Sequence, residues 1–212
     1  MRFADRAEAG RQLGAEVARI GLQRPIVLGL PRGGVPVADE VALALGAPLD
    51  VFVARKIGAP GHEELGIGAV AEGLRVDEPV LSPAAGAVGV TPSQLAVLAA
   101  DAMTEVRRRV RRYRGDRAIA DVAGRDVVVV DDGLATGVTA QAAVAGVRNL
   151  QPAAVVLAAP VCAPETAARL RPLVDDLVCL LMPHDLVAVG SWYENFRQTT
   201  DEEVLELLRS RA

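Results

Sequence analysis

The stretch DVVVVDDGLATGVTAQAA, from Asp126 to Ala143, decides the fold of this chain. Its four consecutive valines lack polar alternation, which predicts a strand buried on both faces, as in a parallel sheet. Asp131 and Asp132 follow the valines, and a loop of small and hydroxyl residues, 133–139, leads into a predicted helix. A buried strand, an acidic pair, a small loop and a helix N-terminus in this order indicate a site for a sugar phosphate.

Each part of the loop suits an anion. Backbone N–H groups at the start of a helix point outward, and the helix dipole favours negative charge there. Thr136 and Thr139 add hydroxyl donors, while Gly133 and Gly137 allow positive φ and a close approach of the backbone to phosphate. In the acidic pair, one carboxylate can accept hydrogen bonds from neighbouring sugar hydroxyls, and the other does the same or holds water on a metal.

The composition sets the class of protein. The chain has 212 residues, of which 51% are hydrophobic and 3% aromatic, so one α/β domain with a core of Ala, Val and Leu is expected. A net charge of -4 gives no general reason to expect a nucleic-acid partner. Cys162 and Cys179 have no metal-ligand spacing and are expected to be reduced thiols. No leader segment and no apolar run of about 18 residues is present, which predicts a cytoplasmic protein without a membrane partner.

Hydrophobic periodicity and punctuation by Gly and Pro predict alternating strands and helices, and hence an α/β fold with a doubly wound parallel sheet. Residues 1–212 are expected to form a single domain, with a core of about 1–182, a small C-terminal hood of about 183–199 and a last helix over 201–210. Residues 57–90 are rich in Gly and Pro and are predicted to be a long loop with a possible hairpin. The remaining expected strands are 26–30, 49–54, 154–159 and 177–181, and the remaining expected helices are 5–20, 35–45, 91–113, 137–149 and 164–170.

Two other classes of protein also end a strand in acidic residues. A Walker-B strand needs a GxxxxGK[ST] loop elsewhere, and the only lysine, Lys56, lies in the different context Ala54-Arg55-Lys56-Ile57. A phospho-receiver domain would need about 120 residues after its acidic strand, whereas about 80 remain here. Neither class fits the chain.

The segment VVVVDDGLATGVTA closely resembles the 5-phosphoribosyl-1-pyrophosphate (PRPP) signature of type I phosphoribosyltransferases. The resemblance implies that Asp131 and Asp132 contact the ribose hydroxyls. It also implies that Mg²⁺ accompanies PRPP, bound by these two carboxylates through water. The loop that would bind the 5′-phosphate consists of Ala135, Thr136, Gly137, Val138 and Thr139.

Two further segments fall where the family contacts pyrophosphate. Pro31-Arg32-Gly33-Gly34 follows the first strand, where the family often has a strained or cis peptide, and Arg32 supplies a charged donor. Arg55 and Lys56 follow the second strand and border the loop 57–73, which in the family closes over the reaction. We predict that Arg32, Gly33, Arg55 and Lys56 serve the pyrophosphate.

The C-terminal segment 183–196 resembles the hood of oxopurine-specific members, but the stacking ring is absent, since residues 186–188 are Leu, Val and Ala. Val187, Trp192 and Tyr193 are the candidate base-binding residues. The alternative for the two rings is that they anchor an irregular segment to the core. Oxopurine members also carry an aspartate where this chain has Ala135, so the base stays open.

The resemblance implies a phosphoribosyltransferase that passes the phosphoribosyl group of PRPP to a nitrogen of a small-molecule acceptor, such as a nucleobase in salvage, and releases pyrophosphate. Dimers are common in the family, so a homodimer fits. The alternative function is a PRPP-binding regulator without turnover. The arginine-rich helix end 107–117 keeps a nucleic-acid contact open for that alternative, although a solvated helix face explains most of it.

Overall fold

A computed structural model of the chain describes residues 2–211, apart from the side chains of residues 63 and 64. At its centre lies a five-stranded, wholly parallel sheet in the order β2-β1-β6-β7-β8. The strand order reverses between β1 and β6, which makes their carboxyl ends the switch point of the sheet. The strands are β1 (Ile26–Gly29), β2 (Leu49–Val51), β6 (Asp126–Val130), β7 (Ala154–Val161) and β8 (Asp176–Leu181).

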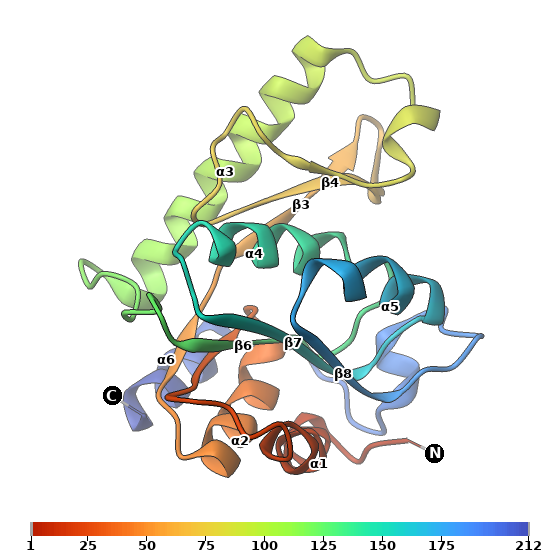
Figure 1. Ribbon diagram of the computed structural model, residues 1–212. Coiled ribbons are helices and arrows are strands. Elements are labelled where there is room, and N and C mark those ends of the chain that lie inside the picture. The colour runs from red at the N-terminus through yellow and green to blue at the C-terminus, as the bar shows by residue number, and fades with distance from the viewer. Residues whose placement is uncertain (1, 212) are drawn as a thin grey trace.

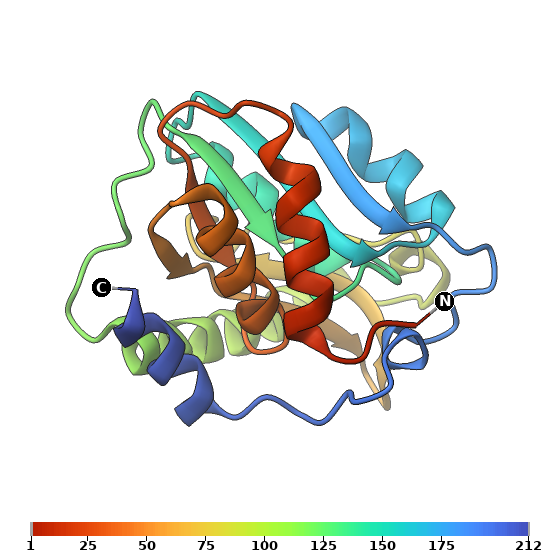
Figure 2. The same ribbon diagram turned by 90° about the horizontal axis from the view of Figure 1, so that it is seen from below.

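Helices cover both faces of this sheet (Figures 1 and 2). On one face lie α1 (Arg6–Ala18), α2 (Gly34–Leu45) and the C-terminal α6 (Asp201–Ser210). On the other lie α4 (Val138–Arg148) and α5 (Pro164–Leu170). The predicted doubly wound α/β fold is confirmed.

The valine run supplies both halves of the core. Val128 and Val130 belong to the cluster beneath α1 and α2, while Val127 and Val129 belong to the cluster beneath α4 and α5. All four side chains are fully buried. The absence of alternation in the sequence therefore reflects burial on both faces of the sheet.

The largest departure from expectation is an arm, which we define as residues 54–114. Residues 57–90 were predicted to be a long loop, and this is wrong in extent, because three antiparallel strands order the segment, with the expected hairpin formed by the first two. The small sheet packs on α4 and is covered by a long helix (Figure 1). The arm consists of β3 (Ala54–Ala59), β4 (His62–Ala71), β5 (Val80–Leu81), the 3₁₀ helix η1 (Ala85–Ala87) and α3 (Pro92–Arg114).

A few apolar residues hold the arm strands despite their glycines. Ile57 and Ile67 are buried in the same cluster as Met103 and Val106 of α3. The chain also leaves the large sheet earlier than predicted. β2 ends at Val51 rather than at residue 54, because the chain crosses into the small sheet, where the Glu72 N–H donates to the carbonyl of Val53 (2.9 Å).

Helix starts and the hood follow the sequence closely. Thr91 and Thr200 both cap helices in complete capping boxes, as their sequences predict. The hood, residues 183–199, contains one regular element, the 3₁₀ helix η3 (Val189–Trp192). The 3₁₀ helix η2 (Arg171–Leu173) follows α5. Among residues 2–211, no helix is both long and apolar enough to span a bilayer.

Candidate active site

Two loops meet at the switch point of the sheet. Residues 31–34 leave β1 and residues 131–139 leave β6, its hydrogen-bonded neighbour. The Leu30 N–H donates to the carbonyl of Val130 (2.8 Å), and a side-chain carbon added at Gly34 would lie 2.6 Å from that same oxygen. The backbones are therefore in close contact where open α/β sheets bind their ligands.

The acidic pair at the end of β6 already accepts some hydrogen bonds from the protein itself. Asp131 Oδ1 accepts the N–H of Asp132 (2.9 Å), and Asp132 Oδ2 accepts two bonds from Arg6, at 2.9 Å from Nε and 2.8 Å from Nη2. The other oxygen of each carboxylate accepts no hydrogen bond from the described residues. One acceptor on each aspartate is thus left for a ligand.

Burial makes the charged forms of these two carboxyl groups less favourable. Burial raises the pKa of Asp131 well above its usual range, and the charge of Asp132 adds to the shift. Burial also raises the pKa of Asp132, while the nearby Arg6 guanidinium opposes the shift. Two adjacent carboxylates away from water need a cation, and Arg6 supplies one positive charge.

Arg6 was not predicted from the sequence, where it is one arginine at the start of an amphipathic helix, 126 residues from its partner. Its side chain is held on three sides. Besides Asp132, it donates from Nη1 to the carbonyl of Arg197 in the hood (2.8 Å), and its guanidinium lies 3.9 Å from the ring centre of Phe196. Arg6 therefore joins the acidic pair to the hood.

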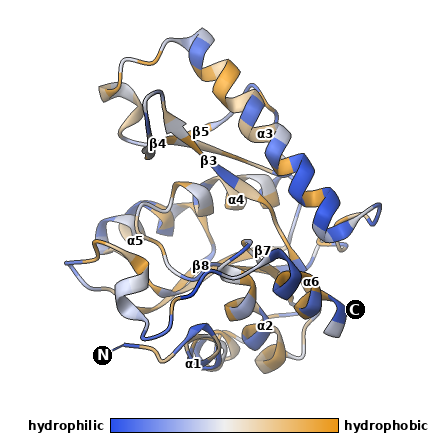
Figure 3. Ribbon diagram, turned by 180° about the vertical axis from the view of Figure 1, so that it is seen from behind, coloured by the Kyte–Doolittle hydropathy of each residue, from blue (hydrophilic) through white to orange (hydrophobic). Residues whose placement is uncertain are grey.

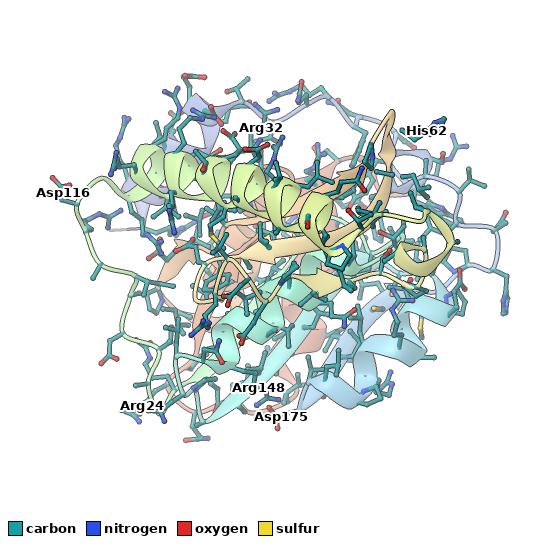
Figure 4. All side chains as sticks on the ribbon, turned by 90° about the horizontal axis from the view of Figure 1, so that it is seen from above. Arg24, Arg32, His62, Asp116, Arg148 and Asp175 are labelled. Atoms are coloured by element: carbon teal, nitrogen blue, oxygen red, sulfur yellow. The ribbon has the colours of Figure 1, made fainter. Side chains whose placement is uncertain are left out.

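The loop after β1 packs directly on the acidic pair. The peptide bond between Pro31 and Arg32 is cis, as the family resemblance implies. A side-chain carbon at Gly33 would overlap Asp132 Oδ2 and lie 3.2 Å from Arg6 Nη2, so glycine is required by space rather than by φ, which is −61°. Arg32 itself reaches toward α6, where Nη1 lies 3.8 Å from Asp201 Oδ1, beside the C-terminal half of α3 (Figure 4).

The predicted phosphate loop, Ala135–Thr139, leads into α4. Gly137 occupies the N-cap position with φ +65°, a left-handed conformation that suits glycine, and α4 begins at Val138. The Val138 side chain is buried in the core, so only its backbone is available to a ligand. Thr136 is exposed and Thr139 half-buried. The loop thus presents a helix N-terminus beside the acidic pair.

The predicted pyrophosphate cations lie on the arm. Arg55 and Lys56 are part of β3, rather than following the end of a large-sheet strand as predicted, because the chain changes sheets after Val51. Both side chains are exposed and line a cavity of about 620 Å³ that also reaches Thr139 of the phosphate loop and Arg109 of α3. This cavity connects the arm to the phosphate loop, whereas Arg32 and the acidic pair lie outside its lining.

The candidate base-binding residues of the hood differ in placement. Tyr193 is buried between Phe3 (ring centres 5.6 Å apart) and Phe196 (5.0 Å), and its hydroxyl donates to the carbonyl of Asp132 (2.6 Å). Trp192 packs against the same cluster, while the Val187 side chain is 92% exposed. The Tyr193 ring therefore anchors the hood to the core, as the alternative to base binding predicted. Its hydroxyl also holds the backbone of the acidic pair.

Most arginines near the end of α3 are engaged in ion pairs. Arg108 and Arg109 both bind Glu105, and Arg112 binds Asp201 and Glu202. Arg114 is buried against Glu72, whose pKa is raised by burial although Arg114 opposes the shift. The hydrophilic stretch of α3 in Figure 3 is thus largely neutralised within the chain rather than presented to a polyanion.

A comparison with known families matches this geometry. The model described as "Phosphoribosyl transferase domain" covers residues 6–193. The chain belongs to the phosphoribosyl transferase family. The predicted family and fold class are confirmed, and the matched range contains both switch-point loops, the arm and most of the hood.

Relatives within the family agree. The Mycobacterium tuberculosis (strain ATCC 25618 / H37Rv) protein named "Putative phosphoribosyl transferase Rv0571c" is 44% identical over 209 residues, and its counterpart "MT0597" from strain CDC 1551 is equally similar. Each match covers 97% of this chain and 46% of the relative, so the chain spans about half the length of these curated relatives.

Solved structures show the same fold. The crystal structure of TT1426 from Thermus thermophilus has a TM-score of 0.83 and 47% identity, with 100% of both chains covered. A purine phosphoribosyltransferase from Pyrococcus horikoshii has a TM-score of 0.50 and 16% identity, covering 92% of this chain and 93% of its own, which shows likeness of fold alone.

Proposed function

We propose that this phosphoribosyl transferase family member moves the 5-phosphoribosyl group of PRPP to a nitrogen acceptor, a nucleobase, and releases pyrophosphate. One observation carries the proposal. At the switch point, each aspartate of the pair keeps one oxygen without a partner among the described residues, directly beside a helix N-terminus. Two acceptors for neighbouring hydroxyls next to an anion site match a ribose 5-phosphate.

The residues have distinct roles in this proposal. Asp131 and Asp132 orient the ribose through its hydroxyls, and the loop 135–139 fixes the 5′-phosphate with backbone N–H groups. The acceptor nitrogen then attacks C1 of the ribose and gives up its proton to solvent, while the bond from C1 to the pyrophosphate oxygen breaks and pyrophosphate leaves with its electron pair. Because the transition state resembles an oxocarbenium ion, positioning and charge stabilisation supply the catalysis.

The leaving group needs positive charge. Arg32 on one side and Arg55 with Lys56 on the other are the candidate cations, and we assign them to the departing pyrophosphate. Gly33 lets the backbone of the first loop approach the site. We assign the acceptor to the space under the hood, with Val187 and Trp192 as candidate contacts.

The donor set at the acidic pair fits Mg²⁺. This ion uses one or two carboxylates and keeps several waters and substrate phosphates as ligands, rather than occupying an all-protein cage. Within residues 2–211, apart from the side chains at 63 and 64, no cluster of three or more His, Cys, Asp or Glu forms such a cage. Asp131 and Asp132 would hold the ion through water, and the bound ion would offset the charge of pyrophosphate.

The test is calorimetric titration of the protein with PRPP and Mg²⁺, on the parent and on Asp131→Asn/Asp132→Asn. Asp126→Asn is the matched control, since Asp126 lies at the opposite end of β6, where its Oδ2 accepts the Gln23 N–H (2.6 Å). Saturable binding in the parent and the control, lost in the double variant, is expected. No binding of PRPP by the parent would falsify the proposal.

Turnover separates an enzyme from a PRPP-binding regulator. Pyrophosphate release is measured from PRPP with a panel of nucleobases, and the expected result is release that depends on one of them. Tight PRPP binding without release on any acceptor would favour the regulator. The ion pairs of Arg108, Arg109 and Arg112 lend no support to a nucleic-acid role for such a regulator.

A further inference from the structure

Two carbonyl groups of the phosphate loop point toward α5. The Thr166 hydroxyl donates to the carbonyl oxygen of Ala135 (2.6 Å), and Nη2 of Arg169 donates to the carbonyl oxygen of Thr136. Thr166 and Arg169 are three residues apart on one helix, so their side chains lie on the same face. Two consecutive carbonyls of the loop are thus held by one surface of α5.

The end of β7 and the start of α5 also support the loop. The Leu134 N–H donates to the carbonyl of Val161 (2.8 Å), and the Leu134 carbonyl accepts the N–H of Ala163 (3.0 Å). A side-chain carbon at Gly137 would lie 2.5 Å from Thr166 Cγ2. Thr166 is fully buried, so water cannot replace its hydroxyl as the partner of Ala135.

The direction of these carbonyls has a chemical consequence. A phosphate oxygen accepts hydrogen bonds and is repelled by a carbonyl oxygen, so a loop that binds phosphate must turn its carbonyls away. The Ala135 carbonyl shares a peptide group with the N–H of Thr136, and the Thr136 carbonyl shares one with the N–H of Gly137. A hydrogen bond to the carbonyl polarises the peptide group and strengthens its N–H as a donor.

The guanidinium of Arg169 is only partly hydrogen-bonded. Its Nε is buried and has no hydrogen-bond partner among the described residues, although burying an unpaired donor is unfavourable. Its Nη2 lies 3.5 Å from the Thr166 hydroxyl as well as on the loop carbonyl. The guanidinium thus brings a positive charge to the outer side of the loop.

From this geometry we propose that Thr166 and Arg169 are positioning residues for the 5′-phosphate, which hold the loop carbonyls of Ala135 and Thr136 and strengthen the amides that bind the anion. The proposal rests on the proposed function for the identity of the anion. Neither residue touches the reacting atoms. Both act through the backbone of the loop.

The test compares ligands that contain the 5′-phosphate with one that lacks it. Thr166→Val keeps the shape and removes the hydroxyl, Arg169→Gln removes the charge, and Arg169→Lys restores it. Arg171→Gln is the matched control, an equal change of charge two residues further on, at an exposed position. Each variant is titrated with ribose 5-phosphate, with PRPP and with inorganic pyrophosphate, and its melting temperature is recorded.

Thr166→Val and Arg169→Gln are expected to weaken ribose 5-phosphate and PRPP by about tenfold each, which corresponds to about 1.4 kcal/mol. Pyrophosphate binding should stay within about twofold of the parent, Arg169→Lys should recover part of the loss, and Arg171→Gln should bind as the parent does. Unchanged ribose 5-phosphate affinity in Arg169→Gln overturns the positioning role, as does an equal loss of pyrophosphate binding.

Two safeguards keep the outcomes distinct. If Thr166→Val does not fold, the Arg169→Gln variant alone decides the test. Thr166→Ser keeps the hydroxyl and should bind as the parent does. A parent protein that binds neither PRPP nor ribose 5-phosphate rejects the proposed function and this inference together. A parent that binds both, with variants that bind equally well, rejects this inference only.

Discussion

The switch point of the large sheet and the arm are built in different ways. At the switch point, Asp132 is fixed from several elements, since its carboxylate accepts from Arg6 of α1 and packs on Gly33, and its carbonyl accepts from Tyr193 of the hood. On the arm, Arg55 and Lys56 are exposed on a strand of the small sheet, whose hairpin tip carries His62 (Figure 4). If the proposed function holds, the ribose phosphate meets a preformed site, whereas the pyrophosphate is met by a more solvated one.

The difference matters because preorganised groups need little ordering when a ligand binds. The switch point should therefore tolerate few substitutions, and the arm should tolerate many, except where it joins the core. At that join, Arg114 of α3 forms a buried ion pair with Glu72 inside the arm, and the other carboxylate oxygen of Glu72 accepts the N–H of Val53, the residue just before the arm (2.7 Å).

The largest expected effect comes from breaking this join. Arg114→Met leaves Glu72 buried without its cation, which should lower the free energy of unfolding by about 3–5 kcal/mol. Because burial raises the folded-state pKa of Glu72 above its unfolded value, the deficit should be largest near neutral pH and shrink as pH falls through that raised pKa. Urea unfolding at two pH values measures it, and a pH-independent deficit would contradict the role of Glu72.

Removing the cation of the acidic pair should have the next largest effect. Arg6→Met abolishes charged hydrogen bonds at a site where the Arg6 side chain is 11% exposed, so a loss of about 1.5–3 kcal/mol in unfolding free energy is expected. Binding of ribose 5-phosphate should weaken as well. Arg11→Met on the same helix is the control, since Arg11 is exposed. Equal losses of unfolding free energy in both variants would contradict a special role of Arg6 at the acidic pair.

A matched pair of glycine substitutions compares the two regions directly. Gly33→Ala forces a methyl group against Asp132 and Arg6, and should cost about 1–3 kcal/mol of stability together with PRPP binding. Gly86→Ala, in η1 of the arm, meets open space and should be close to neutral. Thermal melts and PRPP titrations suffice, and a neutral Gly33→Ala would show that the switch-point loop yields more easily than its packing implies.

The smallest effect is expected on the exposed face of α3. Glu105 pairs with Arg108 and Arg109, and the hydrogen bond from Arg108 lowers its pKa to about 2. The stabilisation should be present above the unfolded pKa of this carboxyl and lost as pH falls toward that lowered value. Glu105→Gln should cost only about 0.3–0.5 kcal/mol per pair near neutral pH, because water screens exposed charges. A loss several times larger would mean that Glu105 also supports the cavity wall.

How far the sequence predicts the structure also differs between the two regions. The buried valines, the capping boxes at Thr91 and Thr200 and the small loop after Asp132 are local signals, and the sheet and the switch-point loops could be predicted from them. The arm strands could not be predicted in full, because their apolar residues, such as Ile57 and Ile67, are few and separated by glycines. Only packing against α3 stabilises these segments as strands.

The residues that support the site were hidden for a related reason. Arg6 and Arg169 look like ordinary arginines on amphipathic helices, and their partners are 126 and 33 residues away. Thr166 looks like a routine residue of a short helix. No periodicity or motif marks a contact that depends on how two helices are placed around a loop.

The contacts of Arg6 also set the order in which the site can assemble during synthesis. Its partners lie 126 residues further along at Asp132 and 191 residues further along at Arg197. Arg6 is therefore synthesised early, but its last hydrogen bond can form only when the hood has been synthesised. Domains fold as the ribosome releases them from the N-terminal end. A nascent chain stalled before the hood would therefore carry the sheet and the phosphate loop, but its acidic pair would lack the contacts of Tyr193 and Arg197. Under the proposed function, such a chain would bind sugar phosphates more weakly until the hood emerges.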